Sequence, residues 1–126
     1  MTITLYGIPN CESVKKARAW LTDQNLPYDF VDFKKVGAPA TRVPVWAEAV
    51  SWDKLINRQG STWRQLSAEQ QSQASTPAGA LTLTLAQPSV IKRPVVEWQN
   101  PLSTGKNVTV GFNATLWSES LHGSSK

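Results

Sequence analysis

The sequence predicts an α/β fold in which a mixed four-stranded sheet is packed with helices and interrupted by an inserted helical segment. Two observations support this prediction. The chain begins with a strand–helix–strand pattern, and it ends with two short strand patterns followed by a helix. Between them, residues 38–90 carry mostly helical patterns punctuated by prolines. We therefore expect a single domain over residues 1–126 with a helical insertion at about residues 38–90.

The N-terminal quarter of the chain is expected to form a β-α-β unit. Thr2–Tyr6 is a short apolar strand, and Ser13–Gln24 has one apolar face, as a helix does. Asn25–Pro27 breaks this helix, and Tyr28–Phe33 alternates as a second strand. Such a unit almost always contains two parallel strands joined by a right-handed crossover.

The next segment is expected to be a loop followed by helix. Lys34–Pro39 contains a glycine and a proline and is predicted to be a loop. Ala40–Val50 has a helical apolar pattern but contains Pro44, so either the helix begins near that residue or a longer helix is interrupted there. Trp52–Ile56 continues as a short helical turn and leads into the polar loop Asn57–Thr62.

Two further helix starts follow. Ser67 and Gln70 have the spacing of a capping box, which predicts a helix to about Ala74. Residues 76–88 open with Thr-Pro and close with proline, which predicts another helix. Leucines alternate in the middle of this segment and would also suit a strand, but its two ends favour the helix.

The C-terminal part is expected to form a β-β-α unit. Val95–Trp98 and Asn107–Val110 are strand patterns joined by the turn-like Pro101–Lys106, which predicts an antiparallel hairpin. Phe112–Leu121 is predicted to be the last helix, and His122–Lys126 a frayed tail in which the histidine faces solvent. Without the middle helices, the order of elements is the thioredoxin-type arrangement.

The single cysteine, Cys11, lies in a turn directly before the first predicted helix and is the candidate nucleophile. A sulfur at the start of a helix faces unpaired N–H groups and the positive end of the helix dipole, and both favour the thiolate. Lys15 and Lys16 add positive potential. A lone cysteine is most often a packed, unreactive side chain, but a turn residue tends to be accessible, which favours a reactive thiol here.

Composition excludes several classes of protein. The sequence is 40% apolar and 17% charged, has no apolar run long enough to span a membrane and begins with no signal-peptide pattern, so we expect a cytoplasmic protein. One cysteine rules out an internal disulfide or dithiol cycle, and one cysteine with one histidine does not provide a metal site. The net charge is +4, but the basic residues are spread along the chain, so nucleic-acid binding is not expected.

Three segments resemble the arsenate reductase-like (ArsC) family, and in particular its YffB-type branch, with the Spx regulators as relatives. They read ITLYGIPNCESVKKARAWL at residues 3–21, LINRQGSTWR at residues 55–64, and SVIKRPVV at residues 89–96 followed by VGF at residues 110–112. The resemblance extends over about residues 2–121. It implies a thioredoxin-like fold with an inserted helical subdomain.

The resemblance also implies a site. Cys11 would be the nucleophile, Arg58 and Arg93 would converge on it, and Pro94 would follow Arg93 through a cis peptide bond. Guanidinium groups bind carboxylates and oxyanions in a bidentate manner. A guanidinium group beside a cysteine also lowers the pKa of its thiol. Either arginine by itself would more often form a surface ion pair. The predicted anion-binding residues are Arg58, Arg93, Lys15, Ser13 and Asn10.

The chain differs from arsenate reductases and from Spx proteins at positions near the predicted site. Arsenate reductases carry a Ser-Arg pair where this chain has Val14 and Lys15, and a further arginine where it has residues 110–112. Spx proteins have a second cysteine at position 14. With no partner sulfur, an external thiol must complete any redox cycle.

Three interpretations of function follow. The first is a monothiol reductase of a small anionic or disulfide substrate, with glutathione as co-substrate, glutaredoxin as a partner and no bound cofactor. The second is an Spx-like regulator that binds RNA polymerase. In the third, Cys11 is only packed.

Overall fold

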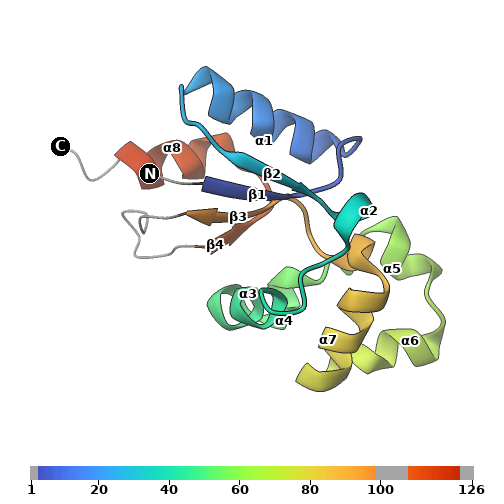
Figure 1. The fold of residues 1–126 in the computed structure, drawn as a ribbon. Coiled ribbons are helices and arrows are strands. Elements are labelled where there is room, and N and C mark those ends of the chain that lie inside the picture. Colours follow the sequence, from blue (N-terminus) through green and yellow to red (C-terminus); the bar gives the residue numbers. More distant parts are fainter. Residues whose placement is uncertain (1–2, 99–107, 123–126) are drawn as a thin grey trace. The chain divides into compact units, whose positions relative to one another are not determined.

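The computed structural model describes residues 3–98 and 108–122, with side chains up to Ser118 (Figure 1). The chain divides into two compact units. One, here called the sheet unit, combines Met1–Asp32 with Arg93–Lys126, and the other, the helical unit, is Phe33–Lys92. The helical insertion expected at about residues 38–90 falls inside the second unit, and the single-domain organisation stays a prediction.

The sheet unit contains the predicted mixed four-stranded sheet. Its strands are β1 (Ile3–Gly7), β2 (Asp29–Asp32), β3 (Val95–Trp98) and β4 (Val108–Val110), in the order β2-β1-β3-β4. β1 is parallel to β2 and antiparallel to β3, and β3 is antiparallel to β4. The parallel pair and the hairpin pairing are as predicted. The predicted turn Pro101–Lys106 lies outside the described residues.

Helices α1 (Glu12–Asp23) and α8 (Ala114–His122) cover one face of this sheet (Figure 1). Alternate strand residues and one helix face meet there, because side chains repeat every two residues in a strand and about every 3.6 in a helix. The buried residues of this core are Ile3, Leu5, Val14, Ala17, Leu21, Val96, Trp98 and Trp117.

The last helix differs from its prediction at both ends. Asn113 accepts a hydrogen bond through Oδ1 from the N–H of Leu116 at 3.0 Å, which caps the helix, so α8 begins two residues later than expected. It also continues to His122, which the sequence had assigned to the tail.

Trp117 is the centre of an aromatic cluster in the sheet unit. Its ring centroid lies 5.2 Å from that of Trp98, 5.5 Å from that of Trp20 and 4.9 Å from that of Phe112, and each pair packs edge to face. The indole N–H of Trp98 donates to the hydroxyl of Thr109 at 3.1 Å. Trp98 and Trp117 therefore belong to the core of the sheet unit, and Trp20 packs against it.

The helical unit consists of short helices. They are α2 (Phe33–Val36), α3 (Val43–Val50), α4 (Trp52–Leu55), α5 (Ser61–Gln65), α6 (Ala68–Ser72), the 3₁₀ turn η1 (Gln73–Ser75), α7 (Pro77–Ala86) and the 3₁₀ turn η2 (Pro88–Val90). Pro44 occupies the first turn of α3, so the helix begins there rather than being interrupted. The alternating leucines lie on the helix α7, not on a strand.

Two predictions for this unit were wrong. Residues 34–39 were expected to form a loop, but α2 forms because Phe33 is buried and its ring packs 6.3 Å from that of Trp46. Residues 57–62 were also expected to be a loop, yet α5 begins at Ser61. Its end is held by the side-chain amide of Gln71, which donates to the carbonyl of Trp63 at 2.9 Å.

The helix caps that the sequence indicates are present. The Ser67 hydroxyl accepts from the N–H of Gln70 at 3.1 Å, and the Gln70 side chain accepts from the N–H of Ser67 at 3.0 Å. Thr76 caps α7 by accepting from the N–H of Gly79 at 3.1 Å. Within residues 3–98 and 108–122, no helix is long and apolar enough to cross a membrane.

Candidate active site

Cys11 is held in the turn between β1 and α1. It is the N-cap of α1, with φ −91° and ψ 130°. Its N–H donates to the carbonyl of Ile8 at 3.2 Å, and its own carbonyl accepts from the N–H of Lys15 at 2.9 Å. The residue is half-buried and packs against the core of the sheet unit. The backbone therefore fixes the thiol at the mouth of the helix, as predicted.

The environment of the thiol favours its ionised form. Partial burial raises the pKa of Cys11, but four attractions outweigh it and leave the pKa below its ordinary value. They are the N–H of Val14, a hydrogen bond from the Arg93 side chain, the charge of Arg93, and the N–H of Ser13. Sulfur is a weak acceptor, and by strict geometry the thiol makes no side-chain cap. The attraction is therefore mainly to the charged thiolate.

Arg93 is positioned by the chain around Pro94. The Arg93–Pro94 peptide bond is cis, which the family resemblance implies. Pro94 is buried, and its carbonyl accepts from the N–H of Gly111 at 2.8 Å. Gly111 adopts φ 78°, a left-handed conformation that suits glycine. This hydrogen bond ties the entry of β3 to the passage between β4 and α8, and so anchors the backbone next to Arg93.

Three of the predicted anion-binding residues surround Cys11 in sequence and are exposed. Asn10 precedes it in the turn, and Ser13 acts on the thiol through its backbone N–H. Lys15 Nζ lies 3.9 Å from the Glu12 carboxylate, an exposed pair on the first turn of α1. These side chains stand at the surface, where a dissolved anion can reach them.

Arg58 lies in the helical unit. Its Nη2 is 3.6 Å from an Asp53 carboxylate oxygen, and its guanidinium carbon is 5.1 Å from the Trp63 ring centroid. It thus has the ion pair that is the commonest fate of a surface arginine. The structure brings Arg93 together with Cys11, whereas the convergence of Arg58 on the thiol stays a prediction.

One group that stabilises the thiolate, and one residue packed against it, were not singled out from the sequence. The N–H of Val14 is the strongest of the groups that stabilise the thiolate, although the sequence marked Val14 only as a departure from relatives. Gly7 ends β1 directly beneath it. A glycine at the end of a strand can signal close approach of another element, so this signal was available.

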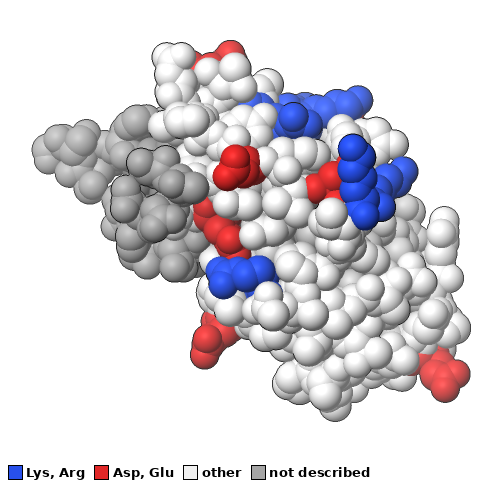
Figure 2. Space-filling model, in the orientation of Figure 1, with Lys and Arg blue, Asp and Glu red and all other residues white. Residues whose placement is uncertain are grey.

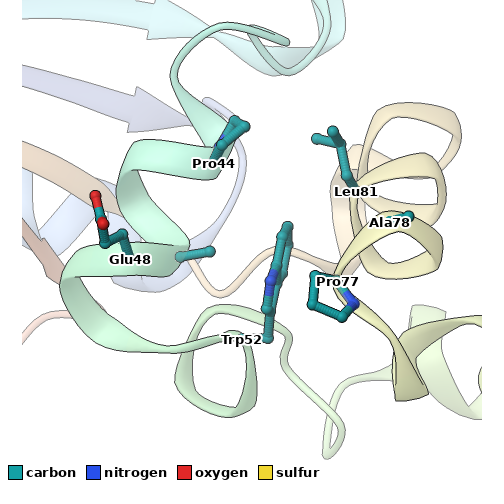
Figure 3. Close-up of a pocket in the computed structure, with 7 residues that line it drawn as sticks. Pro44, Glu48, Trp52, Pro77, Ala78 and Leu81 are labelled. Atoms are coloured by element: carbon teal, nitrogen blue, oxygen red, sulfur yellow. The ribbon is translucent and has the colours of Figure 1, made fainter.

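The helical unit carries an open apolar groove of about 510 Å³ (Figure 3). Its lining residues are Pro44, Ala47, Glu48, Trp52, Pro77, Ala78 and Leu81. The Trp52 ring stands between α3 and α7, and the Glu48 carboxylate points away from it (Figure 3). The groove contains no nucleophile and no basic group, so it is not the candidate active site.

The charged side chains and the possible metal ligands of the described residues are distributed as follows. Figure 2 shows Lys and Arg side chains in separate groups on the face in view, with Asp and Glu between them. Within the part of the chain that the structure describes, no three His, Cys, Asp or Glu side chains are grouped as a metal site requires.

The fold and site define a class: a thioredoxin-like protein with a single cysteine at the start of its first helix. The ArsC family profile matches residues 6–119, and the chain belongs to the ArsC family.

Individual relatives agree with this assignment. An uncharacterised protein of Haemophilus influenzae is 36% identical over 111 residues, which is 88% of this chain and 91% of that protein. The solved structure of a YffB protein is 39% identical and superimposes with a TM-score of 0.81, covering 94% of this chain and 98% of its own. An arsenate reductase (ArsC) related protein from Brucella melitensis is 41% identical with a TM-score of 0.70, over 94% and 92% of the two chains.

Proposed function

We propose that this protein is a glutathione-dependent monothiol reductase. The observation that carries the proposal is the half-buried Cys11 at the N-cap of α1. Burial raises its pKa, but the N–H of Val14 and the side chain of Arg93 lower it to a net value below the ordinary one. A thiolate populated near neutral pH is the form that attacks sulfur or arsenic.

With a disulfide R–S–S–R′ as substrate, the Cys11 thiolate attacks one sulfur, so that a Cys11–S–S–R bond forms and R′–S⁻ leaves and is protonated by water. A glutathione thiolate then attacks the sulfur of R, which releases the Cys11 thiolate and forms G–S–S–R. A second glutathione reduces this product to R–SH and oxidised glutathione. The substrate gains two electrons, and the two glutathione molecules lose them. Glutaredoxin is the proposed partner for the last exchange.

With arsenate as substrate, the Cys11 sulfur would bond to arsenic while one arsenate oxygen leaves as water. One glutathione thiol and one glutaredoxin thiol would then be oxidised to a mixed disulfide, and their two electrons would reduce As(V) to As(III). Water would hydrolyse the remaining Cys11–arsenic bond, which releases arsenite and the Cys11 thiol. Arg93 beside the sulfur, with Lys15 and the N–H groups of Ser13 and Val14, supplies positive potential for either anionic partner. Such a cycle needs a reducing compartment, so we propose that the protein works in the cytoplasm.

A turnover assay tests the proposal. Wild type and Cys11→Ser are each incubated with glutathione and glutaredoxin, with arsenate in one arm and 2-hydroxyethyl disulfide in the other, and oxidised glutathione is measured. We expect turnover by the wild type in at least one arm and none above background by Cys11→Ser. Equal rates for the two proteins in both arms would contradict the proposal.

A second candidate function is regulation by binding RNA polymerase. The observation that favours it is the similarity to the global transcriptional regulator Spx of Listeria innocua, 26% identical over 108 residues, or 83% of this chain and 80% of that protein. Co-purification with the C-terminal domain of the polymerase α subunit tests it. A stable complex that Cys11→Ser forms equally well would favour regulation over catalysis.

A further inference from the structure

Gly7 and Val14 are packed against each other beside the thiol. Gly7 is the last residue of β1, pairs with Asp32 of β2, and lies on the same face of the sheet as Ile3 and Leu5. That face is covered by α1, whose residue Val14 is fully buried. Gly7 does not have a positive φ, so its backbone conformation is open to any residue. The lack of space beside position 7, rather than a need for an unusual backbone conformation, explains why this residue is a glycine.

A side chain at position 7 would collide with Val14. A Cβ placed on Gly7 would lie 2.6 Å from Cγ2 of Val14, 3.5 Å from Cγ1 and 3.6 Å from Cβ. Carbon atoms pack at about 3.5–4.0 Å, so the shortest contact requires a shift of about 1 Å. Valine in a helix strongly prefers one side-chain rotamer and cannot easily turn aside. The first turn of α1 would have to move instead.

That first turn carries the group that acts most strongly on the sulfur. Val14 is the third residue of α1, so its N–H has no partner within the helix and is free to face the N-cap. The same N–H is the largest of the attractions that stabilise the Cys11 thiolate. The turn that holds Cys11 is meanwhile fixed to Ile8, immediately after Gly7. Cys11 is also hydrogen-bonded through its carbonyl to the N–H of Lys15 in the first turn of α1. Moving Val14 away from β1 therefore distorts the segment between Ile8 and Lys15 and changes the position of the Val14 N–H relative to the sulfur.

We propose that Gly7 is a positioning residue for the Cys11 thiol: because Gly7 has no Cβ, Val14 packs directly against β1, and the first turn of α1 keeps the N–H of Val14 directed toward the N-cap residue Cys11. This inference rests on the proposed role of Cys11 as the nucleophile. It adds a residue that acts only through Val14 and touches no substrate. The inference also makes Gly7 and Val14 interdependent, because a larger residue at position 7 fits only if the residue at position 14 is smaller.

The test measures alkylation of Cys11 by iodoacetamide against pH in wild type, Gly7→Ala, Val14→Ala and Gly7→Ala/Val14→Ala. We expect Gly7→Ala to raise the midpoint by about half to one pH unit and to slow alkylation below the midpoint about three- to tenfold, because the thiolate fraction falls tenfold per pH unit there. The double variant should return to the profile of Val14→Ala. The charges near the thiol, Arg93 and the Glu12–Lys15 pair, are unchanged throughout.

Leu21→Ala is the matched control. It removes buried volume from the same face of α1 but lies at the far end of the helix, so it should lower stability without moving the midpoint. A folded Gly7→Ala protein with the wild-type profile would overturn the inference, as would a double variant that stays shifted. If Gly7→Ala does not fold, the steric argument requires that the double variant does, and its failure to fold would also overturn the inference. A wild-type midpoint equal to that of the unfolded chain would instead overturn the proposed function.

Discussion

The two units of this protein are built in different ways, and the difference explains why the candidate active site lies in the sheet unit. In the sheet unit, strand pairing and a single core fix the ends of β1 and β3, and with them Cys11 and Arg93. In the helical unit, the described helices other than α3 and α7 have four or five residues or are 3₁₀ turns, and Arg58 is held by an exposed ion pair. A perturbed thiol needs donors fixed to within fractions of an ångström, and the sheet unit supplies that rigidity.

The largest effect that we expect is a difference in stability between two tryptophan variants, one in each unit. Trp117→Ala removes a nearly fully buried ring with three edge-to-face partners, so we expect it to lower the free energy of unfolding by about 3–5 kcal/mol. Trp52→Ala removes a half-buried ring that lines the open groove and should cost only about 1 kcal/mol. Urea unfolding followed by circular dichroism measures both. Equal losses would show that the two units do not differ in packing as described.

The next largest effect is a difference in Cys11 reactivity between two arginine variants, one in each unit. Arg93→Ala removes a hydrogen bond and a charge from the Cys11 thiolate, so the pKa of the thiol should rise and alkylation near pH 6 should slow by about tenfold. Arg58→Ala should leave the alkylation profile unchanged, because Arg58 is not among the groups that shift this pKa. Iodoacetamide kinetics over a range of pH measure both variants. Slower alkylation of Cys11 in Arg58→Ala, together with an unchanged rate in Arg93→Ala, would show that Arg58 rather than Arg93 acts on the thiol.

A smaller effect is expected at a helix cap in the helical unit. Ser67→Ala removes the acceptor for the N–H of Gln70 and should lower the free energy of unfolding by about 1 kcal/mol. Ser67→Asn keeps an acceptor and serves as the control. Because the cap belongs to the helical unit, reactivity of Cys11 should be unaffected in both. A change in the alkylation rate would show that α6 influences the thiol.

The smallest effect is the dependence of stability on pH. The pKa of Cys11 in the folded protein lies below its value in the unfolded chain, about 8.5, so in the window between the two the unfolded state binds more protons. The stability that the thiolate contributes is therefore fully present above the unfolded pKa and is lost as pH falls through the folded pKa. The free energy of unfolding of the wild type minus that of Cys11→Ser, measured by urea unfolding of the reduced proteins, should be larger near pH 9 than near pH 6. A difference that is constant or larger near pH 6 would contradict this sign.

The sheet unit was predictable from sequence because its elements are periodic and long enough to show their pattern. The strand–helix–strand opening was placed within one or two residues, and Cys11 was correctly put at the helix start. The helical unit was harder where tertiary packing outweighs local pattern. Burial of Phe33 makes a helix of a segment with loop composition, and α5 depends on a contact from Gln71, eight residues beyond its Trp63 partner.

The candidate site was predictable in its residue types but not in its distances. The position of Cys11 before the first helix identified it as the candidate nucleophile, and the family resemblance added Arg93 and the cis peptide at Pro94. The position of Cys11 at a helix start predicted that unpaired N–H groups face the sulfur, but it did not show that the N–H of Val14 has the largest effect. The role of Gly7 depends on a 2.6 Å approach that only coordinates show.

The most direct measurement is the rate of Cys11 alkylation by iodoacetamide against pH, in the native protein and in the same chain unfolded in urea. Cys11 is the only cysteine, so the signal comes from one thiol. If Val14 and Arg93 hold the thiolate as described, the native midpoint lies below the unfolded midpoint, and alkylation near pH 7 shows a larger fraction of ionised thiol. A native midpoint at or above the unfolded one would contradict an activated thiol and, with it, the proposed reductase.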